Sequence, residues 1–205
     1  MRKKILEALN LKIDSNQKWL LLSAGIGGLL TTYTSPTLMK EVVSSLPAEW
    51  LAFQNLAYSF AAFIIGLVWK GCVRENAMKY FLYLTAAETI CGIVLGIYLL
   101  TSWNVWVFAI TSLVYGSLVS VFISKCVMAF KAKLWKNKQR EDYDNNSTII
   151  GGIVCISGFL LALVALPSLK TSILLWTIYC VVDDLGWMYV YFKNRQTLIQ
   201  PDDEK

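Results

Sequence analysis

Three acidic residues stand inside long apolar stretches of the chain. Glu88 lies within residues 80–100, and the adjacent Asp183 and Asp184 lie within residues 171–192. A carboxyl group at membrane depth is costly to insert, so it normally faces the interior of a helix bundle or a water-filled cavity. The chemistry open to such a group is the gain and loss of a proton between two environments.

The depth of the three carboxyls predicts that they can meet. Glu88 stands about nine residues from Lys79, and the two aspartates stand at a similar distance from Lys193. At about 1.5 Å per residue, all three lie near the middle of a hydrocarbon layer roughly 30 Å thick.

The alternative to proton exchange is a structural one, in which each acid is neutral and bonds a hydroxyl on a neighbouring helix. Side chains of adjacent residues point about 100° apart on a helix, so one neighbouring face rarely satisfies both Asp183 and Asp184. We therefore expect one of the two aspartates to face an aqueous cavity.

Six apolar runs surround these residues, and each is close to the length that crosses a bilayer as a helix. Backbone groups must bond internally in lipid, which predicts an all-α membrane protein with six transmembrane helices. The runs cover residues 19–39, 50–69, 80–100, 104–124, 147–169 and 171–192.

The composition agrees with a membrane protein. Hydrophobic residues make up 56% of the 205 residues and charged residues 16%, whereas charged residues approach a quarter of soluble domains. The net charge of +5 comes from basic residues between the apolar runs, so it predicts membrane topology rather than a nucleic-acid partner.

The distribution of lysine and arginine predicts the orientation. If the gaps between runs alternate between two sides, all but two of the 19 Lys and Arg residues fall on the side of the N-terminus. Only Lys40 and Lys170 fall on the other. By the positive-inside rule, both termini are expected in the cytoplasm, in a multi-pass protein of the cytoplasmic (plasma, or inner) membrane.

The chain divides accordingly. Residues 1–18 form a basic amphipathic segment, 19–124 carry four spans, 125–146 form a basic cytoplasmic loop, 147–192 carry two more spans, and 193–205 form a cytoplasmic tail. The bilayer is the first expected partner.

Enzyme and metal chemistry is not predicted. The chain has no histidine, which removes Ser-His and Cys-His catalysis and most transition-metal sites, and its five cysteines show no C-x-x-C spacing. Aspartyl membrane proteases need G-x-G-D, whereas Cys180, Val181 and Val182 precede Asp183 here. We expect no catalytic residue, no metal and no cofactor.

Two stretches are polar for lipid-facing helices. Residues 31–36 are Thr-Thr-Tyr-Thr-Ser-Pro, and Pro36 can break the first helix. Ser117, Ser120 and Ser124 follow an i, i+3, i+7 spacing in the fourth run, which suits either a polar cavity or close packing of helices.

With its spans placed, the chain resembles one six-span half of a major facilitator superfamily transporter. It shares a short basic loop after the second span, a tight hairpin after the third and a long basic loop before the fifth. The family's loop motif G-x-x-x-D-x-x-G-R matches at Gly66 and Arg74, with Lys70 at the acidic position and Val73 at the second glycine.

The resemblance implies two inverted three-helix repeats, with spans one and four lining a central pathway. It would place Tyr33, Tyr115, Ser117 and Ser120 near a small solute of unknown identity, and Glu88 and the aspartates on peripheral spans.

We therefore expect a half-size secondary transporter that works as a homodimer, or with a second membrane half, by alternating access and with proton coupling through its intramembrane acids. The alternative is a non-transporting membrane module, either a substrate-binding subunit of a larger transporter or an accessory or immunity protein.

Overall fold

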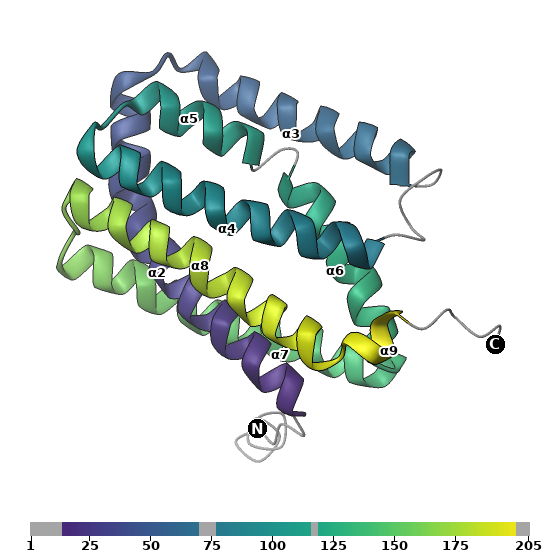
Figure 1. Ribbon diagram of the computed structural model, residues 1–205. Coiled ribbons are helices and arrows are strands. Elements are labelled where there is room, and N and C mark those ends of the chain that lie inside the picture. Colours follow the sequence, from purple (N-terminus) through teal and green to yellow (C-terminus); the bar gives the residue numbers. More distant parts are fainter. Residues whose placement is uncertain (1–13, 70–76, 116–118, 200–205) are drawn as a thin grey trace.

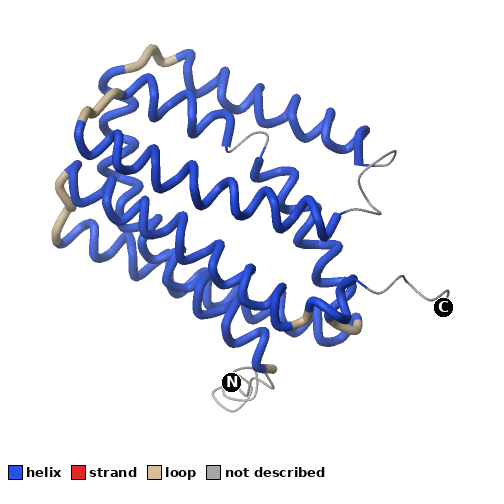
Figure 2. Tube along the Cα trace, viewed as in Figure 1, coloured by secondary structure: helices blue, strands red, loops and turns tan. Residues whose placement is uncertain are grey.

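The computed structural model describes residues 14–69, 77–115 and 119–199, and these residues form helices joined by short turns (Figures 1 and 2). The helices are α2 (Ser15–Ser45), α3 (Glu49–Val68), α4 (Ala77–Thr101), α5 (Val105–Val114), α6 (Ser120–Leu134), α7 (Asn137–Val164), α8 (Leu169–Lys193) and α9 (Arg195–Ile199). The predicted all-α fold class is confirmed over the described residues.

Several sequence predictions fall outside the described residues. They are Arg74, Ser117, the first 13 residues of the basic segment and the tail beyond Ile199. Ser120 begins α6, but its side chain is not described.

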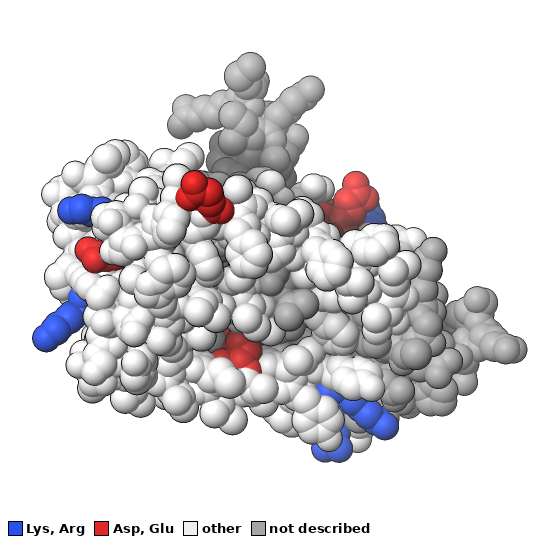
Figure 3. All heavy atoms as spheres, turned by 90° about the horizontal axis from the view of Figure 1, so that it is seen from above, with Lys and Arg blue, Asp and Glu red and all other residues white. Residues whose placement is uncertain are grey.

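Three helices are long and apolar enough to cross a membrane, which supports the membrane character predicted from composition. They span Lys79–Thr101, Asn137–Val164 and Leu169–Lys193, and Ala52–Val68 and Val105–Val114 are shorter apolar helices. The 31-residue α2 is not among the candidates, because its Thr-rich stretch lowers its hydropathy. Figure 3, which views the α3 side, shows a largely uncharged surface.

Helix starts follow local capping chemistry. The Asp14 carboxylate accepts a bond from the Gln17 backbone N–H at 2.8 Å, completing a capping box at the start of α2. Asn104 Oδ1 accepts from the backbone N–H groups of Trp106 and Val107 at the start of α5, and Ser168 Oγ accepts from Thr171 at the start of α8. These caps place the helix boundaries close to the predicted ones.

Two elements differ from the sequence predictions. The fourth run is divided between α5 and α6, and the predicted loop over 125–146 is helical, because α6 continues to Leu134 and α7 begins at Asn137. Apolar residues of that stretch explain the helix: Cys126, Phe130, Trp135 and Tyr143 are buried in one cluster. α2 also continues through Pro36, and its packing against α7 and α8 holds it together.

The long helices alternate in direction, α5 and α6 follow one another in the same direction, and α8 lies at the centre of the packing (Figure 1). Its most extensive contacts are with α2 and α4, α7 packs against α2, and α3 packs more sparsely, mainly against α5 and α6. The two helices that carry Glu88 and the aspartates, α4 and α8, therefore pack against each other within the bundle.

Two apolar clusters occupy opposite ends of the bundle. The first contains Leu20, Phe81, Phe130 and Val190, and the second contains Leu38, Leu99, Phe108 and Ile173. Because α2, α4 and α8 each contribute to both clusters, the middles of these three helices lie between them. The three acids are in that middle layer.

Small residues let α8 approach its neighbours. A Cβ atom built on Gly92 would lie 2.9 Å from the Cys180 Cβ, and one built on Gly96 would lie 2.8 Å from the Thr177 Cβ. The G-x-x-x-G pattern of α4 is thus the surface on which α8 rests.

We predict that Gly96→Ala lowers the free energy of unfolding by about 1–3 kcal/mol, because the added methyl overlaps Thr177. Gly152→Ala is the matched control, since its Cβ would meet nothing within 4 Å. Unfolding of the purified protein in detergent, followed by tryptophan fluorescence, measures both. Equal stability of the two variants would contradict the close crossing.

Candidate functional site

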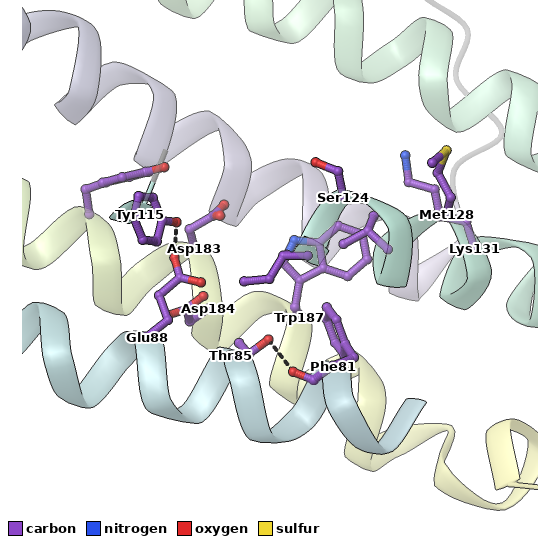
Figure 4. Close-up of a pocket in the computed structure, with 13 residues that line it drawn as sticks. Phe81, Thr85, Glu88, Tyr115, Ser124, Met128, Lys131, Asp183, Asp184 and Trp187 are labelled. Carbon is purple, nitrogen blue, oxygen red and sulfur yellow. Dashed lines mark hydrogen bonds between the residues drawn. The ribbon is translucent and has the colours of Figure 1, made fainter. Parts of the chain in front are cut away.

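The three intramembrane acids gather on one cavity. It has a volume of about 380 Å³ and lies between α4, α6 and α8, with Tyr115 at the end of α5 closing one side. Figure 4 shows Glu88, Asp183 and Asp184 together at one end and Ser124, Met128 and Lys131 along α6 toward the other. The three carboxyls that the sequence singled out therefore share a single site, although Glu88 is far from the two aspartates along the chain.

Two hydroxyl groups hold the acids from neighbouring helices. Tyr115 Oη donates a hydrogen bond to Glu88 Oε1, joining α5 to α4 (Figure 4). Thr89 Oγ1 donates to Asp184 Oδ2 at 2.7 Å, joining α4 to α8. These bonds fix two of the carboxyls at the centre of the bundle.

The two adjacent aspartates have different surroundings. Asp184 is only 4% exposed and contacts α4 through Thr89. Asp183 is half-buried, and its Cβ lies 3.8 Å from the position of a Cβ built on Gly27 of α2. Both line the cavity, so the helix directs the two carboxyls to different neighbours, as expected from their spacing of about 100°.

Ionisable groups reach the cavity from every helix around it. They are Glu88 from α4, Tyr115 at the end of α5, Lys131 from α6, and Tyr179, Asp183 and Asp184 from α8. Lys131 is the cation of this set, and its Nζ is bonded to Asp144 Oδ1 at 2.7 Å and lies 4.6 Å from the centre of the Tyr143 ring.

A second, smaller cavity lies farther along the same helices. Its volume is about 170 Å³, and Thr31, Thr34 and Ser35 of α2 line it with Gln54, Ser112 and Trp176. Ser112 lies three residues before Tyr115, and Trp176 lies three residues before Tyr179; both tyrosines line the first cavity. The polar end of α2 noted in the sequence therefore borders a cavity, but a different one from that of the acids.

The remaining predicted site residues are dispersed. The Tyr33 hydroxyl donates to the Ala165 carbonyl at 3.0 Å at the end of α7, and Tyr33 lines neither cavity. Gly66 lies near the end of α3 with nothing within 4 Å of an added Cβ. Of the two predicted pathway residues whose side chains the structure describes, Tyr33 and Tyr115, Tyr115 is the one placed with the acids.

Sequence reasoning missed several residues of the site. Thr85 lies three residues before Glu88 on α4 and lines the same cavity, and Thr89 bonds Asp184. Tyr179 and Trp187 stand four residues before and after Asp183 on α8. A search for polar and aromatic residues at helical spacing from each acid would have found Thr85, Tyr179 and Trp187.

We predict that Thr89→Val lowers the free energy of unfolding by about 1–3 kcal/mol, because Asp184 loses the hydroxyl that its carboxyl accepts from. Thr89→Ser keeps the hydroxyl and should lie close to the unchanged protein. Thr101→Val is a control on the same helix, since the Thr101 hydroxyl is exposed and bonds only its own helix. Chemical unfolding in detergent compares the three, and a neutral Thr89→Val would show that the bond contributes no stability.

Comparisons of the chain with models of protein families, with curated proteins and with solved structures give no match. The function is therefore argued from the geometry of the acid cavity.

Proposed function

We propose that this protein is a secondary transporter that moves a small solute across the membrane by alternating access, coupled to protons. The observation that carries the proposal is the gathering of Glu88, Asp183 and Asp184 on one cavity between apolar helices. A volume of about 380 Å³ falls within the range of about 300–1,000 Å³ typical of small-molecule sites.

A purely structural role accounts poorly for this arrangement. One hydroxyl–carboxyl bond suffices to join two helices, whereas three carboxyls around an open volume add desolvation cost without further packing. In a proton-coupled transporter such carboxyls have a function. A carboxyl that gains a proton in one conformation and loses it in another couples proton binding to the conformational change.

The two cavities support alternating access. The acid cavity borders the apolar cluster that contains Phe81, and the smaller cavity borders the cluster that contains Leu38 and Phe108. They follow each other along α5 and α8, so a shift of these helices would join the site to one side or the other. Such a shift is the step that alternating access requires.

The proposal includes six spans with both termini in the cytoplasm and two inverted three-helix repeats. The alternating direction of the helices supports it, since the turns before α3, α5 and α8 lie at one end of the bundle and the N-terminal end of α2 lies at the other (Figure 1). Lys40 and Lys170 are near the first end.

The proposal also includes pairing with a second copy, which would supply the opposite lobe of a pathway as in two-half transporters. All of the residues that line the acid cavity come from one chain, which favours a second candidate function. In this second candidate, a single copy of the chain binds the solute and serves as the substrate-binding subunit of a larger transporter.

Coupled flux tests the leading function. We expect proteoliposomes loaded with a pH-sensitive dye to show solute-driven proton movement across a panel of amines, amino acids, sugars and carboxylic acids. Glu88→Gln, Asp183→Asn and Asp184→Asn should abolish that movement, because each removes a group that exchanges a proton in the cavity. Glu141→Gln, an exposed acid on α7, is the matched control. Flux unchanged in all three variants would end the proton-coupling proposal.

The mass of the purified protein in nanodiscs, corrected for lipid and scaffold, tests the pairing. We expect twice the mass of one chain. A strict monomer would contradict the pairing of two copies. It would favour the second candidate function, a substrate-binding subunit of a larger transporter.

A further inference from the structure

The lining of the acid cavity includes three carboxyl side chains, Glu88, Asp183 and Asp184, and one basic side chain, Lys131. Lys131 forms an ion pair with Asp144 of α7. Lys131 lines the cavity, but its ammonium group is bonded to Asp144 and lies over the Tyr143 ring on α7. Buried charges in proteins are normally paired with an opposite charge, so a cationic ligand suits this cavity.

The carboxyls do not converge in the manner of a metal site. Over the described part of the chain, no group of three or more His, Cys, Asp or Glu side chains is placed to hold a metal ion. Two of the acids are turned toward hydroxyl donors on neighbouring helices, Tyr115 and Thr89. The geometry suits a diffuse charge better than a small, hard ion that needs several oxygens at short range.

The rest of the cavity is aromatic. Phe81, Tyr115, Tyr179 and Trp187 line it, and the Phe81 and Trp187 rings meet edge to face with centroids 6.0 Å apart. In Figure 4, Phe81 and Trp187 lie beside the acid cluster, farther along α4 and α8. Trp187 is further held by Phe130, at 5.6 Å between centroids, so its ring is fixed in place. Aromatic faces attract organic cations and also bury apolar surface.

From these observations we propose that the cavity binds an organic cation. Its ammonium group lies against Glu88, Asp183 and Asp184, and its apolar body lies against Phe81 and Trp187. The inference names the solute class of the proposed transporter and rests on that function for its role, although the binding itself can be measured without transport.

Equilibrium binding to the full chain in nanodiscs tests the inference. The probe is radiolabelled benzyltrimethylammonium, which combines a permanent positive charge with an aromatic ring. Benzenesulfonate, with the same ring and a negative charge, is the matched ligand control, and empty nanodiscs correct for partitioning into lipid. We expect saturable binding of the cation and at least about tenfold weaker binding of the anion.

Variants then assign the binding to the cavity. Glu88→Gln, Asp183→Asn and Asp184→Asn should each weaken cation binding by about tenfold or more, because a buried charge pair is lost. Glu141→Gln should leave the affinity unchanged, since this side chain is exposed on α7. If the variants do not fold, the comparison of cation with anion on the unchanged protein still decides.

The outcomes separate this inference from the proposed function. Saturable cation binding without flux would support the solute class and overturn transport. Flux of a neutral or anionic solute by a protein that does not bind the cation would overturn the solute class and leave transport standing. Equal binding of cation and anion, or cation binding unaffected by all three acid substitutions, would overturn the assignment to this cavity.

Discussion

Three carboxyl groups between two apolar clusters are the constraint to which the rest of the bundle conforms. Each would be costly in lipid, so the helices that carry them must face inward, and α8 accordingly lies between α2 and α4 rather than at the edge. The bonds from Thr89 to Asp184 and from Tyr115 to Glu88 then connect α4, α5 and α8 at one level. The apolar clusters on either side close the bundle above and below that level.

Close packing makes this arrangement possible. The glycines of α4 let α8 approach, and Gly186 of α8 receives the Ser23 side chain of α2. The side chains of the middle layer nevertheless leave a space between α4, α6 and α8, and this space is the acid cavity. Its carboxyl groups and its aromatic walls belong to one site, and together they are the basis of the proposed organic-cation binding.

The resemblance to a major facilitator half and the observed packing differ on one point that matters for mechanism. The family layout implies a pathway along spans one and four with the acids at the periphery, whereas here the acids line a cavity with Tyr115 from the fourth run. Tyr33, on the first span, is turned to the carbonyl of Ala165 on the other side of α2. The site therefore depends on contacts between α4 and α8, which the order of spans along the chain does not reveal.

The sequence by itself determined the all-helical class, the long apolar helices, several helix starts and the three acids, because apolar run length, capping residues and charges within apolar runs are local signals. Tertiary structure alone decided which faces meet. Most of residues 125–146 are helical because distant residues bury their aromatic side chains. Thr89, Tyr179 and Trp187 belong to the site because α8 packs against the glycines of α4. Helix rotation and neighbour choice arise from packing between segments far apart in the chain, and no local pattern encodes them.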